Sequence, residues 1–148
     1  MCKHTLTSVF FALLFLIPLC QSFAQQKKKI REVQVIKFDN YDETAKGEQK
    51  VYNETFPDSV EAPLFDAAFA VQKFNFPPAN DTLKKILAGQ KTPQYMPAQK
   101  DPANRLVRYY RNAKENYEYE YNSEGNLRYI KRWGAKHVTA QMTFIYVH

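Results

Sequence analysis

Side chains that could support catalysis or bind a metal are few and far apart in this 148-residue sequence. Two of its three histidines, His137 and His148, lie in a predicted turn and at the last position, and both cysteines, Cys2 and Cys20, lie near the start. Metal centres need clustered His, Cys or carboxylate ligands, and nucleophilic catalysis needs a Ser, Thr or Cys beside an oriented base. Neither pattern occurs, so the sequence predicts no catalytic residue, no metal site and no cofactor.

Paired carboxylates are the one catalytic arrangement that residue spacing does not exclude. Glu118 and Glu120 alternate with tyrosines, which is typical of solvated residues on a strand. Acids from distant positions can nevertheless converge for general acid–base chemistry. A small hydrolase is therefore the least favoured of three alternatives. The other two are binding functions, and they depend on the elements that position the remaining polar and aromatic side chains.

A β-hairpin over residues 117–133 is the most strongly specified of these elements. Tyrosine and glutamate alternate from 117 to 121, and successive side chains on a strand point to opposite faces. Gly125 can adopt a positive φ after a type I turn, so the polar segment 122–126 closes a three-residue loop with a bulge. With residue 122 opposite 126, three pairs follow: Tyr119 with Tyr129, Tyr121 with Leu127, and Glu120 with Arg128.

Two further strands, 105–111 and 138–148, extend the hairpin to a four-stranded antiparallel meander. In this register Tyr109 faces Tyr119, and Tyr129 faces Met142. The aromatic and aliphatic side chains then share one face, which only Lys131 interrupts. That predicted buried face consists of Val107, Tyr109, Tyr117, Tyr119, Tyr121, Leu127, Tyr129, Trp133, Val138, Ala140, Met142, Phe144 and Tyr146.

The predicted fold is α+β, with one or two short helices covering the aromatic face. The segment 31–38 has the β-branched residues of a fifth strand, and 49–55 could form a weak one. A helix is expected over 61–73, where Pro63 suits the first turn, and an irregular apolar segment is the alternative there. Another helix is expected over 81–88, with Asp81 as N-cap and Gly89 past its end. Residues 91–102 contain three prolines and are predicted to be a linker. Together 31–148 form a single domain, with an N-terminal part 31–90 and the meander at 105–148.

The first 24 residues are typical of a secretory signal peptide, with basic residues, an apolar run over 9–19 and a small-x-small cleavage site at 22–24. Cys20 follows Ile-Pro-Leu, which resembles a degraded bacterial lipobox, so lipidation at Cys20 is one alternative to its removal. Retention of the segment as an uncleaved anchor is another. Residues 25–30 are polar and predicted to be a flexible leader. These features predict an exported chain that is periplasmic, outer-membrane-associated or extracellular, with no transmembrane span once it is mature.

The second face of the predicted sheet is the candidate partner surface, with Arg108, Tyr110, Arg128, Ile130 and Arg132 as its residues. Arginine and tyrosine are enriched at protein interfaces. Acids interspersed among the bases argue against nucleic acid. We therefore expect a non-catalytic interaction module with a protein partner in the cell envelope, such as an accessory subunit of an envelope complex. It would use this face or the edge strand 138–148. A glycan-binding module with exposed Tyr and Trp side chains is the alternative.

Two local resemblances complete the sequence evidence. The segment 117–127, Tyr-Glu-Tyr-Glu-Tyr-Asn-Ser-Glu-Gly-Asn-Leu, resembles a single YD (RHS-type) repeat, and the resemblance implies a hairpin in a β-sheet. Asp-Ser-Val at 58–60 and Asp-Thr-Leu at 81–83 resemble the O-glycosylation motif of exported Bacteroidetes proteins, which makes Ser59 and Thr82 candidate sites. For Thr82 a helix cap is the alternative interpretation.

Overall fold

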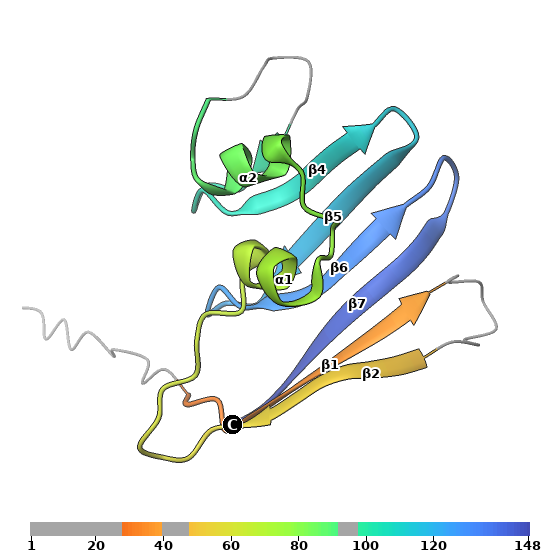
Figure 1. Ribbon diagram of the computed structural model, residues 1–148. Helices are drawn as coiled ribbons and strands as arrows, with labels where there is room; N and C mark the ends of the chain where they lie inside the picture. The colour runs from red at the N-terminus through yellow and green to blue at the C-terminus, as the bar shows by residue number, and fades with distance from the viewer. Residues whose placement is uncertain (1–27, 40–47, 92–97) are drawn as a thin grey trace, which may run out of the picture.

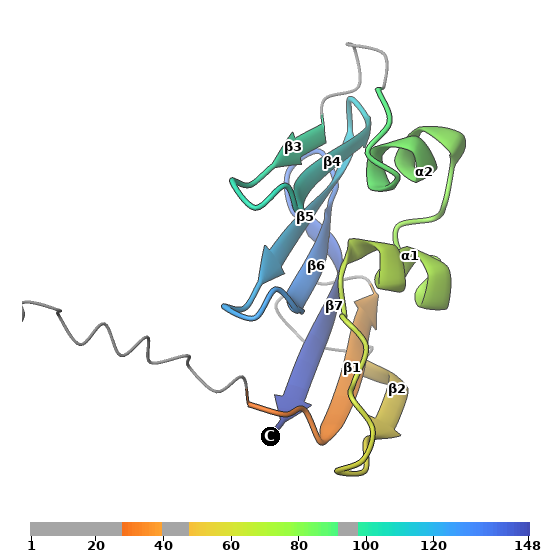
Figure 2. The same cartoon turned by 90° about the vertical axis from the view of Figure 1, so that its left-hand side faces the viewer.

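The computed structural model describes residues 28–39, 48–91 and 98–148, which form one antiparallel sheet with two helices on one of its faces (Figures 1 and 2). In chain order the elements are β1 (Glu32–Asp39), β2 (Glu48–Thr55), α1 (Ala67–Phe74), α2 (Asp81–Leu87), β3 (Ala98–Lys100), β4 (Leu106–Asn112), β5 (Glu115–Tyr121), β6 (Leu127–Trp133) and β7 (Val138–Val147). The predicted signal peptide, with Cys20, lies outside the described residues. No helix in the described ranges is both long and apolar enough to cross a membrane.

The sheet has seven strands in the order β2-β1-β7-β6-β5-β4-β3, rather than the four or five predicted. The meander strands β4 to β7 and the N-terminal β1 are confirmed, and β2 forms where a weak strand was expected. The interpretation of 91–102 as a linker is wrong at β3. Its prolines lie before and after Ala98–Lys100, so none removes a donor from the ladder with β4.

Strand β7 is not the edge that the sequence predicted. β1 pairs with β7 from Glu32 opposite Val147 to Asp39 opposite Ala140, and β2 then pairs with the outer side of β1. Residue patterns within one segment do not indicate which distant strand it pairs with, so the pairing of β1 with β7 was not predicted. The edges of the described sheet are therefore β2 and the short β3, and the partner role expected for a free β7 edge is excluded.

Helix α1 begins at Ala67 rather than at residue 61. Asp66 is its N-cap and accepts a hydrogen bond from the Phe69 N–H at 2.9 Å, while Asn75 ends the helix with φ 51°. The predicted longer helix is wrong because the backbone of Phe65 is used elsewhere. Its N–H donates to Asn126 Oδ1 at 3.1 Å, and its carbonyl accepts from Leu127 N–H at 2.7 Å. These bonds fix the segment before α1 against the loop between β5 and β6.

Helix α2 lies close to its predicted place, but its N-cap is Asn80 and not Asp81. Asn80 Oδ1 accepts from Leu83 N–H at 2.8 Å, and the same side chain donates its amide to the Tyr109 hydroxyl at 2.8 Å. Gly89 has φ +69°, as expected for the residue just past a helix end. The cap thus also attaches α2 to the sheet.

The core lies between the two helices and the sheet. Phe65 is in edge contact with Phe69 at a centroid distance of 4.8 Å and in tilted contact with Tyr146 at 5.6 Å. The buried hydrophobic residues of the core are Ile30, Val33, Val35, Phe56, Phe65, Ala67, Ala70, Phe76, Leu83, Ile86, Leu106, Tyr109, Tyr117, Tyr119, Leu127, Ile130, Ala140, Met142 and Phe144. Ile30 belongs to this set, so the packed domain includes the last residue of the predicted leader.

A β-bulge at Arg128 changes which residues of β6 reach the core. Tyr121 pairs with Leu127 as predicted, but Glu120 pairs with Tyr129, so Arg128 is an extra residue on its strand. From that point the predicted register is wrong by one position. Tyr119 faces Ile130 instead of Tyr129. Because side chains alternate, the whole strand beyond the bulge exchanges its two faces.

The exposures of the β6 side chains confirm this exchange. Ile130 is fully buried and pairs with Met142 of β7, the position predicted for Tyr129. Tyr129 and Trp133 leave the predicted buried face. Leu127 and Ile130 are the two buried residues of β6. Residues three positions apart on a regular strand point to opposite faces, so these two share a face only because the bulge inserts a residue between them.

Smaller register differences occur in the neighbouring strands. Tyr109 pairs with Tyr117 rather than Tyr119, because β4 and β5 are joined by a tighter turn than predicted. The β3–β4 pairing shifts at Val107, and Leu106 is buried in place of that valine. At the other end, the predicted pairing of Trp133 with Val138 is confirmed, and a further shift follows directly after it.

Candidate interaction surface

We call the sheet face away from α1 and α2 the open face (Figure 2). Tyr117 and Tyr119 of β5 are buried, so alternation along the strand places Glu118 and Glu120 on the open face. The neighbouring strands β4 and β6 supply cations and aromatic rings on either side of these acids. The central side chains of the open face are Arg108, Tyr110, Glu118, Glu120, Tyr129, Lys131 and Trp133.

Glu118 is the centre of a hydrogen-bonded cluster on this face. Its Oε2 accepts from Arg108 Nη2 at 3.0 Å and from Trp133 Nε1 at 3.1 Å, and its Oε1 accepts from the Tyr129 hydroxyl at 3.5 Å. The Tyr110 hydroxyl and the Glu118 carboxylate raise the pKa of Arg108 above its ordinary value, so the guanidinium stays charged. The cluster therefore holds an arginine and two aromatic side chains in fixed orientations on a solvent-facing surface.

A second group surrounds Tyr129. Arg128 donates to Glu120 Oε1 at 2.7 Å, and Lys131 Nζ lies 4.3 Å from the centroid of the Tyr129 ring. Hydrogen bonding to Glu120, then partial burial, and then the charges of Glu120 and Glu118 raise the pKa of Tyr129 to about 12. Both carboxylates thus favour the neutral phenol. Such exposed ion pairs contribute only about 0 to 1 kcal/mol each, so their main effect is to order the surface.

The open face becomes more apolar toward β7 and β1. Phe144 of β7 is buried among the helices, so Ile145 and Val147 point to the open side. They are 42% and 46% exposed, and they lie opposite Gln34 and Glu32 of β1. Polar aromatic clusters on β4 to β6 thus adjoin exposed aliphatic side chains on β7.

The structure brings together three of the five predicted partner residues. Arg108, Tyr110 and Arg128 lie on or beside the open face. Ile130 is wrong as a surface residue, because the bulge turns it into the core. Arg132 is also wrong, because it lies between Tyr117 and Ala140 on the helix-covered side, where its Nε donates to Thr139 Oγ1 at 2.9 Å.

Sequence reasoning missed Tyr129, Lys131 and Trp133 as members of the open face. Its strict alternation assigned the two aromatic side chains to the core. A bulge after each hairpin loop could have been predicted from the two apolar residues that follow the loop, because they are three positions apart instead of two. Leu127 with Ile130 and Leu106 with Tyr109 are separated by three positions, and both pairs are buried.

The remaining candidates lie apart from this surface. Ser59 is exposed in the turn after β2, beside Asp58, whose Oδ1 lies 3.2 Å from Arg31 Nη1. Thr82 is half-buried in the first turn of α2. His137 and His148 are exposed and separate. Modification of Ser59 and Thr82 stays a prediction.

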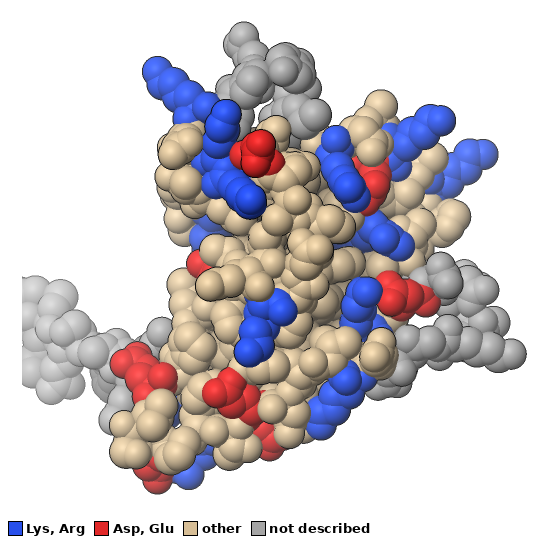
Figure 3. Space-filling model, in the orientation of Figure 1, with Lys and Arg blue, Asp and Glu red and all other residues tan. Residues whose placement is uncertain are grey.

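Lysines and acids are interspersed with uncharged side chains on the helix-covered side (Figure 3). Two hollows border the segment before α1. One of about 560 Å³ is lined by residues of 28–30 and 59–64, and one of about 250 Å³ lies between the two helices and the hairpin loops. Leu64 borders both. Within the described residues no three His, Cys, Asp or Glu side chains are grouped closely enough to hold a metal ion.

The sequence matches no family model, no curated protein and no solved structure.

Proposed function

We propose that the protein is an exported, non-catalytic interaction module that binds a protein partner in the cell envelope through its open face. The observation that carries this proposal is the Glu118 cluster. Trp, Tyr and Arg are the residue types that most often dominate the energy of protein interfaces. Here one carboxylate orients Arg108, Tyr129 and Trp133 together on a rigid sheet.

Preorganisation supports the same proposal in energetic terms. Ordering a flexible side chain at an interface costs about 0.5 to 1.5 kcal/mol. The hydrogen bonds to Glu118 and the ion pair between Arg128 and Glu120 already restrict these side chains before a partner arrives. The adjacent Ile145 and Val147 add apolar area at the border of the cluster. A partner would therefore meet an ordered polar centre beside an apolar margin.

A glycan-binding module is the second candidate. It is favoured by the position of Tyr129 and Trp133, whose rings are half-exposed beside amide and hydroxyl side chains such as Asn116 and Thr143. An aromatic ring offers a flat apolar body with a polar edge, which suits a sugar ring.

Crosslinked capture from an envelope extract tests the first candidate. The wild-type protein should retain a partner that Tyr129→Ala plus Trp133→Ala loses. The matched control is Val60→Ala plus Leu64→Ala, which removes two exposed apolar side chains from the segment between β2 and α1 and should retain the partner. Equal capture by all three proteins would place the interface elsewhere than the open face.

Trp133 fluorescence tests the glycan candidate, because the chain has a single tryptophan. Titration with a panel of soluble oligosaccharides should change its emission if a sugar stacks on the open face. The same sugars should leave the emission unchanged after Tyr129→Ala if that ring forms part of the platform. An unchanged wild-type spectrum across the panel would remove the glycan candidate.

A further inference from the structure

Exposed lysines without an ion-pair partner among the described residues lie beside the open face, at the turns that join β4 to β5 and β6 to β7. Asn116 of β5 pairs with Trp133 of β6, so the two turns are neighbours at one end of the sheet (Figure 1). Neighbouring strands lie about 4.8 Å apart, and the β4–β5 turn is displaced from the β6–β7 turn by two strand positions. The two turns are therefore about 10 Å apart. We call this region the turn end. Its cationic residues are Arg111, Lys114 and Lys136, with Arg132 beside them on the helix-covered side.

Two acids at this end of the sheet, Glu115 and Asp39, are already paired. Glu115 lies 3.5 Å from Arg111 and accepts a hydrogen bond from the Tyr117 hydroxyl at 2.6 Å. Asp39, at the end of β1, lies 3.0 Å from Lys37. Lys114 and Lys136 are exposed and form no ion pair with a described residue. Among the described residues of the two turns, cations therefore outnumber acids, whereas Arg108 and Arg128 on the open face are each paired with an acid.

Aromatic side chains connect the turn end to the open face. Tyr110, Asn116 and Trp133 lie in one row across β4, β5 and β6, directly next to the two turns. Arginine and lysine beside exposed aromatic rings suit a peptide that carries carboxylates next to apolar or aromatic residues. A partner segment lying along this row would place its acids over the turn lysines.

We propose that the turn end recognises an acidic segment of the protein partner, whose aromatic or apolar residues continue onto the row Tyr110, Asn116 and Trp133. This inference rests on the proposed function, because it names the chemistry of the partner at that interface. The attraction between opposite charges steers the encounter and is screened by salt.

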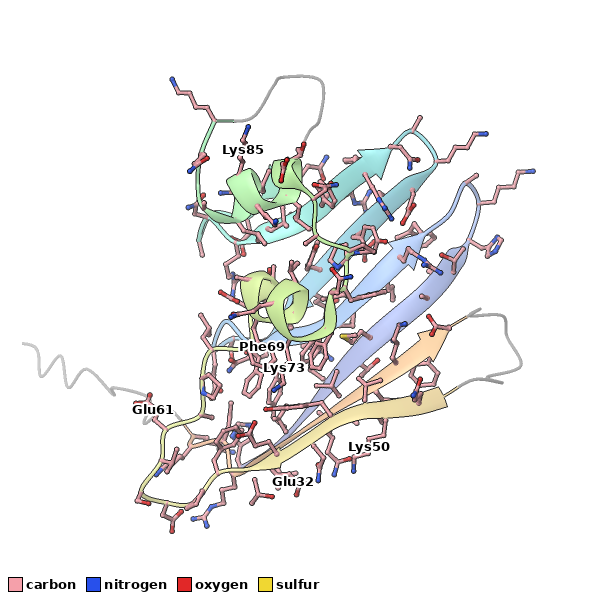
Figure 4. The ribbon with its side chains drawn as sticks, viewed as in Figure 1. Glu32, Lys50, Glu61, Phe69, Lys73 and Lys85 are labelled. Carbon is pink, nitrogen blue, oxygen red and sulfur yellow. The ribbon has the colours of Figure 1, made fainter. Side chains whose placement is uncertain are left out.

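Fluorescence anisotropy with a labelled oligoglutamate peptide tests this inference on the full chain. Wild-type protein should bind the peptide, with affinity that falls as ionic strength rises. Lys114→Glu plus Lys136→Glu should weaken binding at least about tenfold. The matched control is Lys84→Glu plus Lys85→Glu, which changes the net charge equally at exposed positions on α2, where Figure 4 shows Lys85 away from the turns. It should stay within about twofold of wild type.

Three outcomes would overturn the inference. The first is the absence of oligoglutamate binding by the wild-type protein. The second is equal weakening by both double variants, which would mean that net charge alone attracts the peptide. The third is binding of dextran sulfate without binding of oligoglutamate, which would assign the turn end to an anionic glycan. The envelope capture experiment separates this inference from the proposed function. If Tyr129→Ala plus Trp133→Ala abolishes capture of the partner and Lys114→Glu plus Lys136→Glu does not, the proposed function stands. Only the acidic segment is then rejected.

Discussion

The two faces of the sheet use the same residue type in opposite ways. Tyr117 and Tyr119 on the helix-covered face are buried, and burial raises the pKa of both hydroxyls. Tyr129 on the open face keeps its ring half-exposed between two carboxylates and a lysine. Tyrosine composition therefore does not identify either a core or a binding surface. The register decides, and one inserted residue at Arg128 sets the register of β6.

Truncation of Tyr119 should give the largest difference between the faces. Tyr119→Ala should lower the free energy of unfolding by about 3 to 5 kcal/mol as a core truncation, whereas Glu118→Ala on the open face should lower it by about 1 kcal/mol or less. Tyr119→Phe should be neutral or stabilising, since the buried hydroxyl has no hydrogen-bond partner. Urea denaturation measures all three. Similar small losses for Tyr119→Ala and Glu118→Ala would contradict the assignment of Tyr119 to the core.

Two adjacent residues of β6 test the bulge directly. Ile130→Ala should lower the free energy of unfolding by about 2 to 5 kcal/mol, because Ile130 is fully buried. Tyr129→Ala should lower it by about 1 kcal/mol or less, because that side chain is half-exposed. Strict alternation without a bulge predicts the reverse order. Thermal or urea unfolding of the two variants therefore separates the two registers.

Asn126 tests how the covered face is attached to the hairpin loop. It is 2% exposed, and its Oδ1 accepts the hydrogen bond from Phe65 N–H. Asn126→Ala should lower the free energy of unfolding by about 1 to 3 kcal/mol, since a buried donor loses its partner. Ser123→Ala, an exposed change in the same loop, is the control and should have little effect. Equal stability of both variants would show that the Phe65 contact is dispensable.

The smallest expected effect is a change in the pKa of Tyr129. Glu120→Gln should lower that pKa from about 12 toward the ordinary value of 10.0, because hydrogen bonding to Glu120 is the largest cause of the shift. The folded state binds this proton more tightly than the unfolded chain. Its contribution to stability is therefore present below about pH 10 and is lost as the pH rises to about 12. NMR titration of labelled tyrosine rings measures the pKa, with Tyr129→Phe identifying the resonance.

Much of the fold was predictable because hairpin chemistry is local. The loop Asn122 to Asn126 closes with hydrogen bonds from Asn122 N–H to Asn126 O at 2.8 Å and from Gly125 N–H to Asn122 O at 3.1 Å. Gly125 has φ +88°, as its position in the turn requires. The predicted pair of Tyr121 with Leu127 follows from this loop and is confirmed.

A second loop of the same design went unrecognised. Asp101 N–H donates to Arg105 O at 2.9 Å, and Asn104 N–H donates to Asp101 O at 2.9 Å. Asn104 takes the positive φ, at 63°, that Gly125 takes in the other loop. Each loop is followed by a buried leucine and then by an extra residue. The strand before this loop has only three residues between prolines, so alternation gave no signal there.

By itself the sequence predicted which segments form the meander strands, the positive φ of Gly125 in the β5–β6 loop and the end of α2 before Gly89. These properties depend on backbone preferences within a few residues. Only the tertiary structure decided that β1 covers β7, that Phe65 fixes the β5–β6 loop, and that Ile130 rather than Tyr129 meets Met142. Those choices depend on burying apolar area between elements distant in sequence. These tertiary contacts also determine the candidate partner surface, because the side chains of the sheet that do not enter the core lie on the open face.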